Sequence, residues 1–81
     1  MKSLLRKPTV LERLGIQKSK LSDDIRKGLI PPPIKIGNRA VAWVSTEIDC
    51  LVDALIAGKS KTEIKTLITY LVKNRTGGML S

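Results

Sequence analysis

The chain has 81 residues, a formal net charge of +8, no histidine and one cysteine. This length corresponds to one small domain with a thin core. A single cysteine excludes an intrachain disulfide, and a zinc site needs more histidine or cysteine ligands than the sequence contains. The commonest general base, histidine, is missing as well. We therefore expect no metal, no cofactor, no small-molecule ligand and no enzymatic activity.

The positive charge is concentrated in the first half of the chain. Residues 1–40 contain ten Lys and Arg against three Asp and Glu, whereas residues 41–81 contain five against four. This asymmetry suggests that one surface faces a polyanion. The N-terminal sequence MKSLLRKPTV lacks the apolar run of a signal peptide, and no apolar run approaches the length of a membrane span. We expect a cytoplasmic protein with no membrane partner.

The chain is expected to begin with a flexible basic arm, residues 1–7. A first helix is predicted over residues 9–14. Thr9 and Glu12 have the spacing of a capping box, with Thr9 as the N-cap. Gly15 follows the last apolar residue and is typical of a helix end.

A second helix is predicted over residues 18–27, and Gly28 ends it. Leu21 and Ile25 lie four residues apart and are expected to face the core. Asp23–Asp24 is expected on the flank of this helix. Two short helices joined by a tight glycine turn form a helix-turn-helix, in which the N-terminal residues of the second helix contact bases in the major groove.

A proline connector and a β-hairpin follow. Pro31–Pro33 cannot lie in a helix and favour a stiff extended segment. A hairpin is predicted over residues 34–43, with a turn at Gly37–Asn38 or at Asn38–Arg39. Both registers place the same apolar side chains on one face: Ile34, Ile36, Val41 and Trp43. Trp43 is expected to be a core anchor.

Two longer helices complete the chain. Ser45 is expected to cap a third helix over residues 45–57, with Cys50 as a buried, inert thiol. Its apolar stripe consists of Ile48, Leu51, Val52, Leu55 and Ile56. A fourth helix is predicted over residues 60–73, opened by a Ser60–Glu63 capping box. Its stripe consists of Ile64, Leu67, Ile68, Leu71 and Val72.

The run GIQKSKLSDDIRKGLIPPPIKIGNRAVAWVSTEID resembles the AlpA-type phage regulatory proteins, within the wider group of excisionase-like and MerR-like winged helices. The resemblance covers about residues 8–57 and is most specific over Gly37–Trp43. It implies a mainly α winged helix-turn-helix domain with a small β-hairpin. Residues 58–75 are then an additional helix, packed on the domain or used to form a homodimer or higher oligomer. Residues 76–81 are expected to be a flexible tail.

These observations favour a regulator that binds double-stranded DNA and controls integrase or excision genes of a prophage or integrated element. An excisionase that bends DNA at attachment sites is the alternative, and a protein-interaction adaptor acting through the fourth helix is a further one. RNA binding is disfavoured, because Trp43 and Tyr70 are the only aromatic residues. The predicted DNA-binding residues are Gln17, Lys18, Ser19, Lys20, Ser22, Arg26, Lys35, Asn38 and Arg39.

Overall fold

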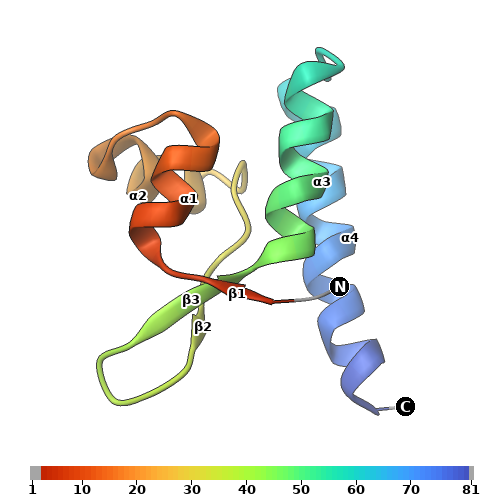
Figure 1. Cartoon of the computed structure of the whole chain (residues 1–81). Coiled ribbons are helices and arrows are strands. Elements are labelled where there is room, and N and C mark those ends of the chain that lie inside the picture. The colour runs from red at the N-terminus through yellow and green to blue at the C-terminus, as the bar shows by residue number, and fades with distance from the viewer. Residues whose placement is uncertain (1–2, 81) are drawn as a thin grey trace.

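The structure is a computed structural model that describes residues 3–80, with side chains for residues 3–75. Its elements are β1 (Leu4–Leu5), α1 (Lys7–Leu14), α2 (Lys18–Arg26), β2 (Ile34–Lys35), β3 (Val41–Val44), α3 (Ser45–Ile56) and α4 (Lys61–Leu80). The predicted fold class is confirmed: a mainly helical chain with a small antiparallel sheet, compatible with a winged helix-turn-helix (Figure 1). Residues 1, 2 and 81, in the predicted arm and tail, lie outside this description. No helix within residues 3–80 is long and apolar enough to cross a membrane.

Helix α1 begins earlier than predicted. It starts at Lys7, with Pro8 in its first turn, where a missing N–H costs no helical hydrogen bond. The predicted Thr9 cap is therefore wrong, because Thr9 already lies inside the helix. The helix ends as predicted at Gly15, whose φ of 66° lies in the left-handed region and whose N–H bonds to the Glu12 carbonyl oxygen.

Helix α2 spans nearly the predicted residues 18–27, ending at Arg26. Gly28 follows with a φ of 77°. The next residue, Leu29, donates its N–H to the Asp24 carbonyl oxygen at 2.9 Å. This hydrogen bond satisfies a carbonyl group in the last turn of the helix, so the chain can leave the helix sharply and enter the proline connector.

Strand β1 forms where the sequence predicts a flexible arm, so that prediction is wrong for residues 4 and 5. The two residues of β1 lie opposite Val44 and Trp43 of β3. Just before β1, the Ser3 N–H donates to Ser45 Oγ and the Ser3 carbonyl oxygen accepts from the Ser45 N–H, both at 2.8 Å. The Ser45 hydroxyl is thus used by the N-terminal segment. Its predicted capping role is wrong, and Val44 is the N-cap of α3.

The hairpin has a register that differs from both predicted ones by one residue. Ile34 lies opposite Ala42, and Lys35 lies opposite Val41. Residues directly opposite each other in an antiparallel pair point to the same face. Ile34 therefore does not share a face with Val41 and Trp43, and the predicted common apolar face is wrong, as expected for a one-residue slip.

The hairpin loop explains this register. The Ile36 N–H donates to the Ala40 carbonyl oxygen at 2.9 Å, which leaves three residues, 37–39, in the connection. A two-residue hairpin turn needs a positive φ at one or both central positions. Positive φ angles within residues 3–80 occur at other glycines and not at Gly37 or Asn38. The favoured short turns are therefore not formed.

Helices cover the sheet on both faces. Trp43 points to the helix-turn-helix, where it lines a groove with Leu21 of α2. Ile34 and Val44 point the other way and line a groove with Leu71 of α4. Because both faces of β3 are covered, its sequence VAWV is continuously apolar instead of alternating.

Helix α3 buries only part of the expected stripe. Ile48 and Leu51 are buried as predicted, whereas Leu55 and Ile56 are 51% and 79% exposed. Residues three apart share a helix face. Cys50 lies away from the face of Ile48 and Leu51, so its side chain is exposed and the prediction of a buried thiol is wrong.

Helix α4 begins with the predicted capping box. The Ser60 N–H donates to Glu63 Oε1 at 3.0 Å, and the Glu63 N–H donates to Ser60 Oγ at 3.2 Å. The Ser60 backbone N–H lowers the pKa of Glu63, with further contributions from the Ser60 hydroxyl and Lys59. The helix was expected to end at residue 73, but its backbone continues to Leu80 through most of the predicted tail.

The apolar stripe of α4 is used inside the chain. Ile64 and Ile68 are buried in the core, and the other three members pack against it half-buried. Helices α3 and α4 run side by side in opposite directions, on the right of Figure 1. Packing against α3 and, through Leu71, against the sheet therefore accounts for the stripe.

Trp43 is the predicted core anchor, and its burial is confirmed. Only 1% of the residue is exposed, and its indole Nε1–H donates to the Pro31 carbonyl oxygen at 3.0 Å. Trp43→Ala should lower the free energy of unfolding by about 3–5 kcal/mol, since it removes a large buried ring. Urea denaturation followed by circular dichroism measures this change.

Ile56→Ala is the control, because this large apolar side chain is 79% exposed. It should change the free energy of unfolding by no more than about 0.5 kcal/mol. Equal losses in the two variants would contradict the assignment of Trp43 as the core anchor.

Candidate nucleic-acid interface

All nine predicted site residues are exposed. Gln17 precedes α2 in extended conformation, without a side-chain cap bond. Five more lie on α2: Lys18, Ser19, Lys20, Ser22 and Arg26. The last three belong to the hairpin, with Lys35 on β2 and Asn38 and Arg39 in the loop. In Figure 1, α2 and the hairpin loop both lie on the left of the molecule, away from α4.

The outward side of α2 is defined by its buried residues. Leu21 and Asp24 are buried, so the helix faces the core on that side. Ser19, Ser22 and Arg26 recur at intervals of three and four residues, which places them together on the opposite, exposed side. The side chain of Arg26 is 79% exposed. This side of α2 is therefore exposed to solvent.

The hairpin continues the α2 surface. Ser22 of α2 and Val41 of β3 line one groove, together with Pro33 at the end of the proline connector. Lys7, at the start of α1, lines the same groove. Lys7 was missed as a site residue because the first helix was predicted to begin at Thr9. The signal that could have found it is Pro8, which favours the first turn of a helix.

Lys20 lies apart from the surface that α2 forms with the hairpin. Its Nζ lies 3.0 Å from Asp24 Oδ2, and the two residues are spaced as helix neighbours. Lys20 instead lines a cavity of about 200 Å³ between the helix-turn-helix, α3 and α4, with Lys61 on its edge. It therefore lies on the flank of α2 that faces away from the hairpin.

Asp23 neutralises part of the positive charge at the end of α2. Arg26 Nη2 and Lys27 Nζ each lie 2.9 Å from its carboxylate. The Lys27 ammonium, aided by Arg26, lowers the pKa of Asp23, and Asp23 in turn raises the pKa of Lys27. Both ion pairs are exposed, so they orient the side chains more than they stabilise the fold.

The remaining cations of this surface are not paired with a carboxylate of the described residues. Four of them form no ion pair within the described part of the chain: Lys7, Lys18, Lys35 and Arg39. They come from α1, α2, β2 and the hairpin loop, so both the helix-turn-helix and the hairpin contribute exposed charge. Among residues 3–80, no three His, Cys, Asp or Glu side chains are grouped as metal ligands.

A helix-turn-helix followed by an exposed basic hairpin is compatible with the winged helix-turn-helix class. The chain belongs to the AlpA family, because residues 3–53 match the family described as "Prophage CP4-57 regulatory protein (AlpA)". The family suggested by the sequence is thereby confirmed. The matched residues include β1, the helix-turn-helix, the hairpin and most of α3, and exclude α4.

One relative comes from Enterobacteria phage P4, the "Uncharacterized protein ORF88". It is 35% identical over 57 residues, which cover 70% of this chain and 65% of the relative. The chain thus spans just under two thirds of the length of that relative. No solved structure matches the chain significantly.

The Asp23 ion pairs can be tested without a partner molecule. Lys27→Gln should raise the pKa of Asp23 toward its ordinary value of 3.8, because Lys27 is the largest cause of the lowering. Lys20→Gln, which removes a cation paired with Asp24, should leave the titration of Asp23 nearly unchanged. Carboxyl chemical shifts followed by NMR against pH measure both effects. An unchanged Asp23 titration in Lys27→Gln would contradict the pairing.

Proposed function

We propose that the chain binds double-stranded DNA sequence-specifically, as a transcription regulator of a prophage or integrated element. The observation that carries this proposal is the continuous surface formed by α2 and the hairpin, with exposed cations from both. Membership of a family of prophage regulatory proteins supports it. The location of the cations supports it further, since they lie mostly before residue 41. A cytoplasmic location belongs to the same proposal, and no catalytic role is assigned.

In this proposal α2 enters the major groove. The hydroxyl groups of Ser19 and Ser22 are small, exposed donors and acceptors that suit base edges or nearby phosphates. Lys18 and Arg26 flank them as phosphate ligands, and Gln17 contacts the duplex at the start of the helix. Lys20 contacts a phosphate at the edge of the interface, because its flank of α2 faces away from the hairpin.

The hairpin serves as the wing. Arg39 and Asn38 stand in its loop, where they can reach the adjacent minor groove, and an arginine suits a narrow groove of strongly negative potential. Lys35 is on the strand behind the loop and contacts the DNA backbone. Helix and wing together give the protein two contacts on one side of the duplex.

Footprinting on the promoters and attachment sites of the host element distinguishes the two roles that this surface can serve. Protection of a promoter with little bending indicates a transcription regulator, which we propose. Protection of several sites at an attachment region, with bending of the duplex, indicates an excisionase. Absence of protection on both would contradict DNA recognition.

Arg39→Ala and Ser19→Ala should weaken DNA binding in different ways. Arg39→Ala removes one exposed charge and should reduce the slope of log affinity against log salt by about 0.9. Ser19→Ala removes no charge, so its slope should stay the same. Its discrimination between specific and random duplexes should fall by about 1–3 kcal/mol if a base contact is lost. Competition binding at several salt concentrations measures both quantities.

Lys73→Ala is the matched charge control, because Lys73 is exposed on α4, away from the proposed surface. It should change the salt slope much less than Arg39→Ala does. If Arg39→Ala and Ser19→Ala bind like the parent at every salt concentration, the DNA-binding surface lies elsewhere on the molecule.

We also propose self-association through residues 60–73. Among residues 60–73, the exposed apolar side chain is that of Tyr70, which lines a shallow groove with Ala54 and Leu67. Sedimentation velocity of the full chain should show a concentration-dependent dimer, and Tyr70→Lys should remove it. A protein that stays monomeric throughout the micromolar range would contradict self-association. The proposal for the DNA-binding surface would not be affected.

A further inference from the structure

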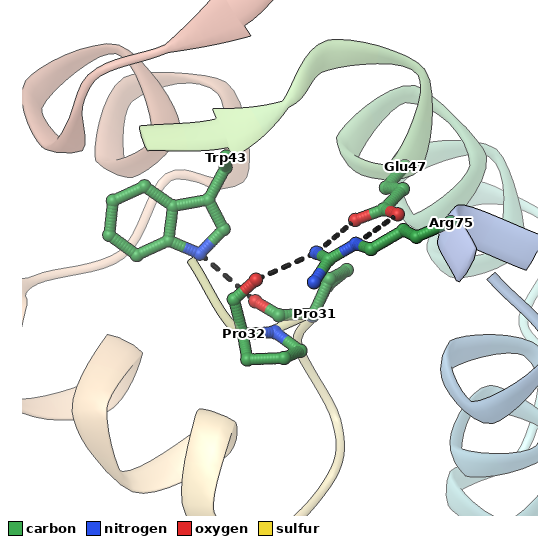
Figure 2. A network of polar contacts seen from close by, with 5 residues as sticks. All are labelled: Pro31, Pro32, Trp43, Glu47 and Arg75. Carbon is green, nitrogen blue, oxygen red and sulfur yellow. Dashed lines mark hydrogen bonds and ion pairs between the residues drawn. The ribbon is translucent and has the colours of Figure 1, made fainter. Parts of the chain in front are cut away.

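The proline connector cannot hold itself in place. Pro31, Pro32 and Pro33 have no backbone N–H, so only their carbonyl oxygens can form hydrogen bonds. Two of these oxygens are bound by side chains from distant elements (Figure 2). Trp43 Nε1–H donates to the Pro31 carbonyl at 3.0 Å, and Arg75 Nη2–H donates to the Pro32 carbonyl at 2.7 Å. The angle at which the connector enters the hairpin therefore depends on Trp43 and Arg75.

Arg75 is itself held by an almost buried carboxylate. Its Nε–H donates to Glu47 Oε2 at 2.7 Å, and its Nη2–H also bonds to Glu47 Oε1. The Glu47 side chain is 5% exposed and the Arg75 side chain is 20% exposed. A planar guanidinium with fixed donors matches a carboxylate in this paired geometry, and a lysine does not. The position of Arg75 is thus tightly defined.

This network ties together both ends of the hairpin. Pro32 lies two residues before β2, and Glu47 lies in the first turn of α3, three residues after β3 ends. Arg75 reaches both from α4, as Figure 2 shows. Its helix lies outside residues 3–53, the part shared with the family. One side chain of α4 therefore connects the segment entering the hairpin with the segment leaving it.

We infer that Arg75 is a positioning residue for the wing. It fixes the orientation of the hairpin, and thereby the place at which Arg39 and Asn38 meet the DNA, without touching the DNA itself. This inference rests on the proposed DNA binding. It assigns to α4 a role in recognition, although Figure 1 places α4 on the other side of the molecule from the hairpin loop.

If Arg75 only stabilised the fold, the effect of Arg39→Ala on DNA binding would not depend on Arg75. A double-mutant cycle therefore distinguishes a positioning role from a purely structural one. In the parent background, Arg39→Ala is expected to weaken specific binding by about tenfold. In an Arg75→Met background the wing is misplaced, so adding Arg39→Ala should cost less than about threefold. Ser19→Ala should cost the same in both backgrounds, because α2 is held by the core. Equal costs of Arg39→Ala in both backgrounds would overturn the inference.

Arg75→Met alone leaves Glu47 buried without a partner, which can destabilise the fold. The double variant Glu47→Leu with Arg75→Met removes both charges and should keep the parent's melting temperature. It still lacks the bond to Pro32, so the inference predicts the same reduced cost of Arg39→Ala. Arg75→Lys keeps the charge without the planar fork and should restore binding only in part. Full rescue by Arg75→Lys would contradict the positioning role.

An NMR comparison without DNA tests the same inference independently of the proposed function. In the double variant, the amide signals of Lys35 and Ile36 and the indole N–H signal of Trp43 should shift, while those of Ser19 and Ser22 should not. Lys73→Met, an exposed change on the same helix, should shift none of them. Unchanged hairpin signals would overturn the inference. If the hairpin signals shift but the parent protein binds no DNA, the proposed function is contradicted while the positioning role of Arg75 is still supported.

Discussion

Strand β3 is the constraint on which the rest of the structure depends. Its last two residues pair with β1 along one edge, and its first two pair with β2 along the other. Its side chains alternate between the helix-turn-helix on one face and α4 on the other. Trp43 lies at the centre, fully packed and bonded to the proline connector. This four-residue strand can hold so many elements in a thin core because each edge pairs with another strand and helices cover both faces.

Local signals in the sequence predicted the helices. The features that these signals did not predict, strand β1 and the hairpin register, are not determined by a local sequence pattern. Gly15 and the Ser60–Glu63 capping box mark helix ends through bonds within a few residues, so spacing alone predicts them. Strand β1 has only two residues and pairs with β3 about forty positions later, so no local pattern indicates it. The hairpin register depends on the φ angles of Gly37 and Asn38, which the residue types permit but do not impose.

The same division applies to the candidate site. Helical spacing alone placed the α2 residues on an exposed side, and the ion pairs of Asp23 and Asp24 follow from spacings of three and four residues that the sequence already contains. Arg75 has no such signal. It lies 28 positions from Glu47 and 43 from Pro32, and only the path of α4 brings them together. The contacts of Arg75 can therefore be identified from the structure and not from the sequence.

The Glu47–Arg75 pair is better suited to fixing an orientation than to stabilising the fold. Removing two charges from water is costly, and well-packed apolar side chains often stabilise a core as well or better. A planar guanidinium that bonds to both carboxylate oxygens and to a carbonyl allows only a narrow range of arrangements. The hairpin needs such a constraint, because three successive prolines leave its base without backbone donors. The wing of the proposed DNA-binding surface therefore takes its direction from a helix on the far side of the molecule.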